Sequence, residues 1–285
     1  MSREDNAGRA RYTLEDLQAL MARLRDPERG CPWDLQQDFH TIAPHTLEEC
    51  YELVDAIERG DFAQVREELG DVLFQVIFYA QMGREQQRFE WDELVHNLVE
   101  KLLRRHPHVF PSGKWPSGNL HDDVAGVTTD VEQVHHTWEQ IKQNEREAKQ
   151  QGGVLDDVPV ALPALSRSTK LQKRAARVGF DWENWQQVLE KIREEQDEVV
   201  EAITSGDRAA IQEEIGDLLF ACVNLARFVD VDSETALRAA NRKFEQRFRF
   251  IEAQLAARGQ RPEEVSLAIM DALWDEAKRN ERLCD

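Results

Sequence analysis

Apolar side chains recur along this chain at the spacing of α-helices that bury one face. Residues 12–25 show the pattern first, with apolar side chains at Leu14, Leu17, Leu20, Met21 and Leu24. Residues 62–83 carry a wider apolar face, formed by Val65, Leu69, Val72, Leu73, Val76 and Ile77. Positions three and four apart share one face of a helix. A half-buried β-strand would show apolar and polar residues in strict alternation, and no stretch of the chain sustains that pattern. The sequence therefore predicts an all-α protein.

Glycine, proline and capping residues set the expected boundaries between these helices. We expect residues 30–34 to end the first helix, and then a loop that contains Pro44, a turn at Arg59-Gly60-Asp61 and a loop over 107–123. After the first helix, the expected helices are 46–58, 62–83, 90–105, 130–150, 162–178, 185–203, 208–229, 234–255 and 262–281. Helices of this kind joined by short turns are typical of helical bundles.

A long internal repeat dominates the sequence. Residues 48–74 read EECYELVDAIERGDFAQVREELGDVLF, and residues 194–220 read EEQDEVVEAITSGDRAAIQEEIGDLLF. The two stretches align without a gap at an offset of 146, and 15 of the 27 columns are identical. A repeat of this length predicts two tandem copies of a helical-bundle module. Gly152, Gly153 and Pro159 mark the boundary, which gives an N-terminal domain at 1–150, a linker at 151–160 and a C-terminal domain at 161–285.

The repeat extends beyond this stretch in the same order of elements. The matching pairs are Gly30-x-x-Trp33 with Gly179-x-x-Trp182, Lys101 and Arg105 with Lys243 and Arg247, and Trp138-x-x-x-Lys142-x-Asn144-Glu145 with Trp274-x-x-x-Lys278-x-Asn280-Glu281.

Carboxylates recur in register within the repeat. EExxE on one helix and ExxD on the next each place two carboxylates on one helix face. Two antiparallel helices can direct all four into one space, where they repel one another unless a cation is bound. Oxygen ligands without His or Cys favour Mg²⁺, with Mn²⁺ as a substitute. The predicted metal ligands are Glu49, Glu52, Glu68 and Asp71 in the first copy and Glu195, Glu198, Glu214 and Asp217 in the second.

The alternative interpretation is a set of solvated acidic helix faces, because a chain with 55 acidic residues forms EExxE easily by chance. Two features favour a site. Both motifs recur in the second copy, and Gly70 and Gly216 lie inside predicted helices, where each glycine costs about 1 kcal/mol relative to Ala. Glycines retained at this cost indicate close helix packing or room for a ligand.

Three further residues of the second copy have two interpretations each. Lys243 and Arg247 are either phosphate contacts, for which Arg is suited by its bidentate geometry, or surface residues paired with Glu245 or Glu252. Trp274 is either a core residue or a platform for a nucleobase. Taken alone, Lys243 and Arg247 favour the surface interpretation, and the recurrence of the Trp-to-Glu pattern leaves both interpretations of Trp274 open.

The formal net charge of −19 argues against nucleic acid or an anionic membrane as the main partner. A small phosphorylated ligand remains compatible if metal ions offset the charge locally. The four cysteines form no CxxC, no apolar leader is evident, and the apolar runs are too short to span a bilayer. We therefore expect a cytoplasmic protein that binds neither membranes nor nucleic acid.

The paired acidic helices, together with the stretches IAPHTLEE, EELGDVLFQVIFYAQ and KLQKRAARVGFDW, resemble the MazG family of nucleoside triphosphate pyrophosphohydrolases, within the all-α NTP pyrophosphatase superfamily. The tandem arrangement is similar to that of full-length bacterial members, over nearly the whole chain. The resemblance implies hydrolysis of NTPs and dNTPs, ATP included, to the monophosphate and pyrophosphate. It also implies Mg²⁺, a homodimer and a role in control of the nucleotide pool.

Carried onto the second copy, the resemblance assigns roles residue by residue. The four carboxylates would bind the metal, and Glu194 would position or deprotonate water, so that the implied catalytic set is Glu194, Glu195 and Glu198. The implied substrate-binding residues are Lys191, Lys243 and Arg247 for the phosphates and Trp274 for the base. The first copy differs from the second at His45, which aligns with Lys191. The fixed positive charge of the lysine is therefore missing from the first copy.

Two other functions stay open at this point. A narrower enzyme of the same superfamily, such as a dUTP/dCTP pyrophosphatase or a phosphoribosyl-ATP pyrophosphohydrolase, would share the acidic helices. A non-enzymatic helical scaffold that binds a protein partner through its acidic faces would share them too. The range of nucleotides from which pyrophosphate is released discriminates among the three.

Overall fold

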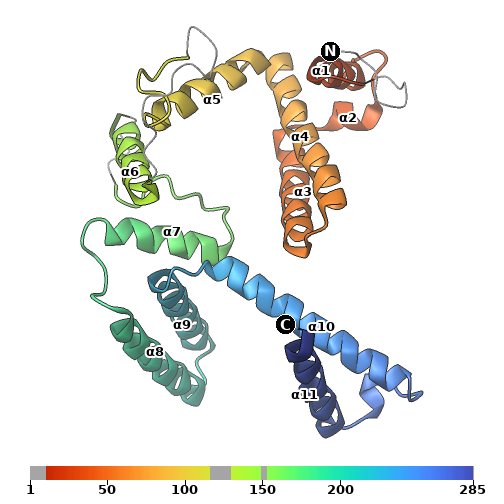
Figure 1. Ribbon diagram of the computed structural model, residues 1–285, viewed down its shortest axis with the longest axis vertical. Helices are drawn as coiled ribbons and strands as arrows, with labels where there is room; N and C mark the ends of the chain where they lie inside the picture. The colour runs from red at the N-terminus through yellow and green to blue at the C-terminus, as the bar shows by residue number, and fades with distance from the viewer. Residues whose placement is uncertain (1–10, 116–129, 149–152, 285) are drawn as a thin grey trace. The chain divides into compact units, whose positions relative to one another are not determined.

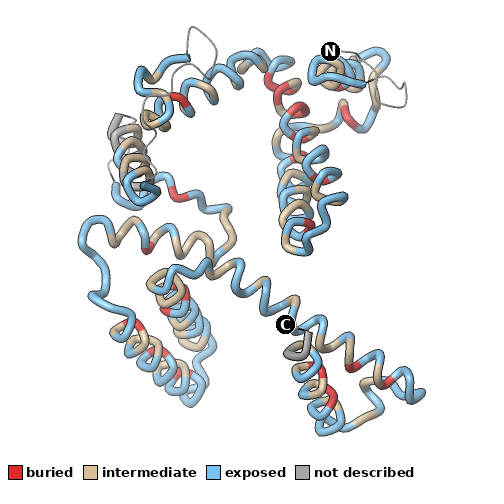
Figure 2. Tube along the Cα trace, in the orientation of Figure 1, coloured by how far each residue is buried: buried red, intermediate tan, exposed pale blue. Residues whose placement is uncertain are grey.

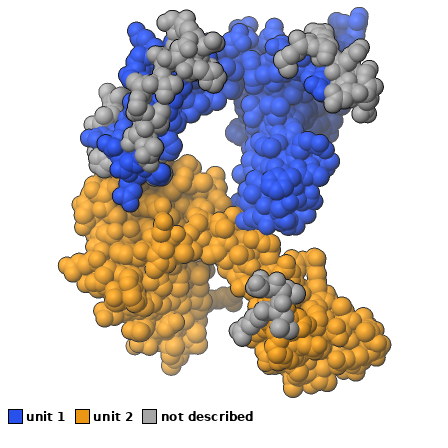
Figure 3. Space-filling view, in the orientation of Figure 1, with its two compact units in different colours: residues 1–143 blue, residues 144–285 orange. Residues whose placement is uncertain are grey.

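The computed structural model of the protein describes residues 11–115, 130–148 and 153–284 (Figure 1). Within those ranges the chain forms helices and no strand, so the all-α fold predicted from the periodicity is confirmed. The chain divides into two compact units, residues 1–143 and 144–285 (Figure 3), and the division falls within α6 (Val131–Ala148). Among the described helices, none is both long and apolar enough to cross a membrane.

Unit 1 is built around a pair of long helices. Its helices before α6 are α1 (Leu14–Leu24), α2 (Pro32–Gln36), α3 (Phe39–Arg59), α4 (Phe62–Glu85) and α5 (Trp91–Arg105). α3 packs along α4, which also contacts α1 and α5. The buried residues between α1, α3 and α4 (Figure 2) form one cluster, which consists of Met21, Ile42, Ile77, Phe78 and Met82.

Unit 2 repeats the helix pair and adds a long helix that leaves it. Its helices are α7 (Ala164–Ala176), α8 (Trp185–Ser205), α9 (Arg208–Phe228), α10 (Ser233–Ala256) and α11 (Leu267–Cys284), with one 3-10 turn at Pro262–Glu264. α8 packs along α9, and α7 contacts α9 and α10. The later part of α10 packs on α11 around Ile251, Leu255 and Leu273. α10 therefore carries α11 away from α8 and α9 (Figure 1).

A two-residue turn reverses the chain between the acidic helices of each unit. Gly60 has a φ of 69°, a left-handed conformation that glycine adopts without strain, and its N–H bonds to the last turn of α3. Asp61 then caps α4 by accepting a hydrogen bond from the N–H of Gln64. Gly206 and Asp207 repeat this arrangement between α8 and α9. The turn brings EExxE and ExxD side by side in both copies.

The prediction of a loop around Pro44 is wrong, because α3 begins at Phe39 and contains Pro44. Asp38 caps this helix by accepting two hydrogen bonds from backbone N–H groups of its first turn. Phe39 stacks on Tyr79 of α4, and Ile42 is buried in the core. The cap and the packing together outweigh the backbone hydrogen bond that proline cannot donate.

Two other boundaries also differ from the prediction. Residues 30–34, predicted only to end the first helix, contain the start of α2, because the fixed φ of Pro32 suits the first position of a helix. The helix predicted at 262–281 is interrupted before Leu267. Val265 has an extended backbone and packs on the cluster between α10 and α11, so the helix restarts after it.

Arg25 is a buried cation that connects three parts of unit 1. Its guanidinium forms an ion pair with Glu85 at the end of α4, at 2.8 Å, and donates to the backbone carbonyls of Asp34 and Gln37. It also lies over the ring of Phe78. Only 7% of the Arg25 side chain is exposed, so its removal takes away the charged donor to Glu85, the donor to the Gln37 carbonyl and one of two donors to the Asp34 carbonyl.

Arg25→Ala is expected to lower the free energy of unfolding by about 2 kcal/mol, because it removes the hydrogen bonds of a buried charged group and its contact with Phe78. Chemical denaturation followed by circular dichroism measures the effect. Arg23→Ala is the matched control: Arg23 is exposed and lies 3.9 Å from Asp26, so its loss should cost less than about 0.5 kcal/mol. Equal effects of the two substitutions would contradict the structural role given to Arg25.

Candidate metal centre

Each pair of acidic helices gathers three carboxylates. In unit 2, Glu195 of α8 lies with Glu214 and Asp217 of α9, and one oxygen of each lies within 4.8 Å of those of the other two. Glu195 is buried, with 5% of its surface exposed, and its Oε2 has no hydrogen-bond partner among the described residues. A buried carboxylate oxygen without a donor costs free energy unless a ligand satisfies it.

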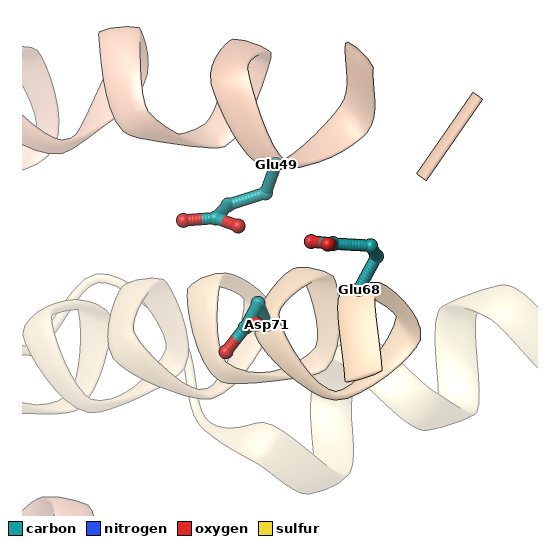
Figure 4. Close-up of side chains that lie close together, drawn as sticks. All are labelled: Glu49, Glu68 and Asp71. Atoms are coloured by element: carbon teal, nitrogen blue, oxygen red, sulfur yellow. The ribbon is translucent and has the colours of Figure 1, made fainter. Parts of the chain in front are cut away.

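Unit 1 contains the equivalent group (Figure 4). Glu49 extends from α3 toward α4, where Glu68 and Asp71 lie, and the three oxygens are again within 4.8 Å of one another. The buried member here is Glu68 of α4, whereas in unit 2 it is Glu195 of α8. The two copies therefore share the same three positions but bury different members of the set.

The fourth predicted ligand of each copy lies outside these groups of three. Glu52 and Glu198 follow Glu49 and Glu195 by three residues on the same helix face, but neither belongs to the group within 4.8 Å. The side chain of Glu198 is 44% exposed and lies 4.0 Å from the Nζ of Lys191. Loss of solvent raises the pKa of the Glu198 carboxyl, and Lys191 opposes that shift.

Lys191 neutralises part of the charge in unit 2. Its Nζ lies 2.8 Å from an oxygen of Glu194 and 2.8 Å from Oε1 of Glu195. The hydrogen bonds to Glu194 and then Glu195 raise the pKa of Lys191 above its ordinary value. The ammonium is therefore charged and lies in contact with the carboxylate group.

In unit 1 the position of Lys191 is taken by His45, whose Nδ1 lies 3.5 Å from Glu48. Burial, followed by the neighbouring carboxylates of both helices, raises the pKa of the Glu49 carboxyl. In the described part of the chain, no Lys or Arg forms an ion pair with Glu49, Glu68 or Asp71. The negative charge of the unit 1 group is thus left without a cationic neighbour there.

Gln64 is a contact of the unit 1 group that the sequence-based prediction missed. Its Nε2 donates to Oε1 of Glu68 at 3.1 Å, and its Oε1 accepts from Arg59 at 2.6 Å. Arg59 also pairs with Asp55 at 2.8 Å, outside the group. Gln64 precedes Glu68 by four residues, so helical spacing alone could have revealed the pair. The matching residue in unit 2 is Ala210.

The basic and aromatic residues of α10 and α11 form a separate cluster. Arg247 makes a bidentate ion pair with Glu281, with a closest contact of 2.6 Å, and its guanidinium lies 5.3 Å from the ring centre of Trp274. The hydrogen bond from Arg247 lowers the pKa of the Glu281 carboxyl. The alternative pairing of Arg247 with Glu245 is wrong, because Glu245 pairs with Arg249.

Among the described residues of unit 2, this cluster makes no hydrogen bond or ion pair with the group of Glu195, Glu214 and Asp217. Lys243 is exposed on α10, and Trp274 is half-buried against the core between α10 and α11. α10 leaves α9 after the connecting turn (Figure 1). Of the predicted substrate-binding residues, Lys191 alone contacts the carboxylate group among the described side chains.

Gly70 and Gly216 are not packed against another described helix of their own unit. A Cβ at either position would meet no heavy atom within 4 Å, outside the glycine's own surroundings on its helix. Of the two explanations suggested by the sequence, close packing against another helix of the same unit is therefore wrong for the described residues. Room for a ligand, or for another chain, is the explanation that the structure leaves.

The chemistry of both groups suits a hard divalent cation. Every ligand atom is a carboxylate oxygen, and neither group contains His or Cys. Mg²⁺ and Mn²⁺ take such oxygen ligands, whereas Zn²⁺ is more often held by His and Cys. The unpartnered Oε2 of Glu195 is one such oxygen at the buried side of the unit 2 group.

Comparison with known proteins agrees with this arrangement. The sequence model of the MazG nucleotide pyrophosphohydrolase domain matches residues 37–110 and 183–249, which contain the two acidic helix pairs. The chain is 48% identical over 270 residues to a nucleoside triphosphate pyrophosphohydrolase of Escherichia coli strain K12, covering 94% of this chain and 98% of that protein. It is 41% identical over 265 residues to the MazG nucleoside triphosphate pyrophosphohydrolase/pyrophosphatase of Thermotoga maritima, covering 93% and 95%.

A more distant relative, a nucleoside triphosphate pyrophosphohydrolase of Mycolicibacterium smegmatis, is 30% identical over 271 residues and is covered over 68% of its length. The resemblance noted in the sequence is thus confirmed over nearly the full chain. Because the family domain occurs twice, each time at a helix pair that gathers three carboxylates, the chain belongs to the MazG family of nucleotide pyrophosphohydrolases.

Proposed function

We propose that this protein hydrolyses nucleoside triphosphates to the monophosphate and pyrophosphate with Mg²⁺ held by the carboxylates of unit 2. The observation that carries the proposal is the group of Glu195, Glu214 and Asp217, in a chain whose relatives are named nucleoside triphosphate pyrophosphohydrolases. Mn²⁺ is expected to replace Mg²⁺, because the ligand set suits both ions. Glu198, on the same face of α8, completes the proposed ligand set.

The residues of unit 2 can support attack of water on the α-phosphorus. When bound, Mg²⁺ offsets the charge of the triphosphate and lowers the pKa of nearby water. Glu194 is exposed at the edge of the group, where Lys191 holds one of its oxygens, and is proposed to accept the proton of the attacking water. The choice of the α-phosphorus rests on the family, and the remaining requirements are positioning and charge.

Phosphate and base contacts are proposed for the residues of α10 and α11. Arg247 presents two nitrogens to Glu281, and this planar fork also fits two oxygens of a phosphate. Lys243 lies four residues before Arg247 on the same helix face. Trp274 lies beside the guanidinium and offers its ring to a base. In the complex, a phosphate would replace Glu281 as the partner of Arg247.

We also infer a homodimer in which a second copy covers the acidic helix pairs. Exposed apolar residues recur at the same repeat positions on both pairs, next to Gly70 and Gly216, where a Cβ would meet open space. An apolar stripe beside small residues fits contact with another helix. The stripe of unit 1 consists of Leu69, Leu73 and Val76 on α4, and the separate stripe of unit 2 consists of Ile215 and Leu219 on α9.

Helix lengths support a contribution of the second copy to the unit 2 site. At 1.5 Å per residue, Glu214 lies about 21 Å before the end of α9, and Arg247 lies about 21 Å after the start of α10. An α10 that runs antiparallel along a copy of α9 therefore places Arg247 level with Glu214. Because α10 diverges from the α9 of its own chain (Figure 1), we propose that the α10 of a second copy takes this place.

Co-expression of Glu195→Gln and Arg247→Ala chains is expected to restore activity that neither variant has alone. Random pairing yields mixed dimers in half of the population, each with one intact site, which is about a quarter of the wild-type sites. Pyrophosphate release from the purified mixture measures the recovery. Glu195→Gln with Glu214→Gln is the control, because both lesions affect the same helix pair and should restore nothing. A dimer without recovery would contradict a shared site, and a monomer in light scattering would contradict the dimer itself.

A screen of NTPs and dNTPs with Mg²⁺, followed by pyrophosphate release, tests the proposed breadth. Release from many nucleotides supports the broad enzyme that we propose. Release from a single nucleotide would favour a narrower superfamily enzyme, and release from none would favour the non-enzymatic scaffold.

The cytoplasm is the compartment that we propose for this activity, because it holds the nucleoside triphosphate pool. The free thiols of Cys31, Cys50 and Cys222 agree with a reducing compartment.

A further inference from the structure

The two carboxylate groups differ by one fixed positive charge. In unit 2 the Nζ of Lys191 lies 2.8 Å from Oε1 of Glu195, which is a member of the group, and 2.8 Å from Glu194. The other oxygen of Glu195 is buried without a hydrogen-bond partner among the described residues. Lys191 thus offsets part of the negative charge that would attract a divalent cation, while it leaves one buried oxygen available.

In unit 1 the contact to the carboxylate group comes from an uncharged side chain instead of a lysine. Gln64 donates an amide hydrogen bond to Glu68, and the cation behind it, Arg59, is paired with Asp55. His45 lies against Glu48, which is outside the group of three. The carboxylates of unit 1 are therefore positioned without being neutralised by a contacting cation in the described structure.

We propose that Lys191 is the resident counter-ion of the unit 2 group in the nucleotide-free protein, and that it weakens divalent-cation binding there until the phosphates of a nucleotide draw the ammonium away. The inference rests on the proposed metal site and adds the order in which the two groups bind a divalent cation and nucleotide. The unit 1 group takes up a divalent cation without nucleotide, whereas the unit 2 group binds the cation tightly only together with nucleotide.

Charge explains this coupling. An ammonium within hydrogen-bond distance of a carboxylate ligand repels a dication that approaches the same oxygens. Lys191 lies on the exposed edge of the group, with 32% of its side chain accessible, so a triphosphate can compete for it. Each phosphate oxygen that takes over the ammonium returns negative charge to the carboxylates. Nucleotide and cation therefore promote each other's binding through one side chain, as reciprocal linkage requires.

Equilibrium binding of Mn²⁺ alone to the full-length protein, followed by electron paramagnetic resonance of the free ion, tests this order. Glu49→Gln is expected to remove the tighter class of site and Glu195→Gln the weaker one. The double variant Glu49→Gln/Glu195→Gln supplies the background from other acidic surfaces. Loss of the tighter class in Glu195→Gln would overturn the proposal.

A second experiment removes the lysine charge from unit 2 and adds one at the equivalent position of unit 1, and it tests the role of Lys191 more directly than the first. Lys191→Met is expected to tighten Mn²⁺ binding at unit 2 on the order of tenfold, and His45→Lys is expected to weaken it at unit 1 by a similar factor. Circular dichroism confirms that each variant is folded. Unchanged or weaker Mn²⁺ binding in folded Lys191→Met would overturn the counter-ion role. Absence of both classes of site in the wild type would instead refute the proposed metal centre, and absence of pyrophosphate release with both classes present would refute the proposed reaction only.

Discussion

Glu195→Gln is expected to reduce pyrophosphate release on the order of a hundredfold to a thousandfold, the range seen when one preorganised electrostatic group is removed from an active site. Glu195 is the buried member of the unit 2 group and the one in contact with Lys191. The substitution keeps the shape of the side chain but removes the charge that a divalent cation requires. Steady-state pyrophosphate release with saturating nucleotide and Mg²⁺ measures the loss.

Glu49→Gln is the matched substitution in the other copy and is expected to leave most of the activity. Unit 1 has His45 where unit 2 has Lys191, and one lost charge-assisted phosphate contact corresponds to about 1.5–3 kcal/mol, roughly tenfold to a hundredfold in rate or binding. The two variants therefore separate the contributions of two nearly identical groups. If folded Glu49→Gln proves the more damaging of the two, the working site lies in unit 1.

Removal of divalent cations is expected to abolish the activity completely and reversibly. Without a cation, three clustered carboxylates meet a polyanionic substrate, and repulsion opposes both binding and attack. Pyrophosphate release should fall to background in excess chelator and return when Mg²⁺ or Mn²⁺ is restored. Full activity in excess chelator would refute the metal requirement.

The same cation should stabilise the fold, because it binds the folded chain preferentially. At a concentration a hundredfold above its dissociation constant, a single site contributes about 2.7 kcal/mol to the free energy of unfolding. Thermal unfolding with and without Mg²⁺ measures this as a rise in the melting temperature. The double variant Glu49→Gln/Glu195→Gln is the control and should show little of the rise.

Local signals in the sequence were sufficient for the helix pairs and for their carboxylates. The Gly60-Asp61 turn follows from two residues whose conformational and capping preferences are strong, and the repeat shows the same turn at Gly206-Asp207. Once both helices run antiparallel, the spacing of Glu and Asp brings three of the four carboxylates of each copy together. These features depend on neighbours in the chain.

Features that depend on tertiary packing were missed or remained open. From the sequence alone, Pro44 predicts a break in the helix. The burial of Ile42 and the stacking of Phe39 on Tyr79 nevertheless stabilise a helix that contains it. Arg247 finds its partner in Glu281, on a different helix, which no spacing rule indicates.

The sequence pattern also could not predict which carboxylate of each group is buried. Glu68 is buried in unit 1 and Glu195 in unit 2, although the two stretches align without a gap. This difference arises from the different residues that surround the two helix pairs, and an alignment of the two repeats does not show those surroundings. The course of α10, which leaves the α9 of its own chain, is likewise set by its packing on α11.

Product analysis after hydrolysis of a nucleoside triphosphate in water enriched in heavy oxygen addresses the central claim. Phosphorus NMR of a reaction with Mg²⁺ should show the nucleoside monophosphate and pyrophosphate, with the heavy oxygen in the monophosphate, because water attacks the α-phosphorus. The Glu195→Gln protein, handled in the same way, should show neither product above background. A nucleoside diphosphate with inorganic phosphate, or heavy oxygen in the pyrophosphate, would contradict the proposed reaction.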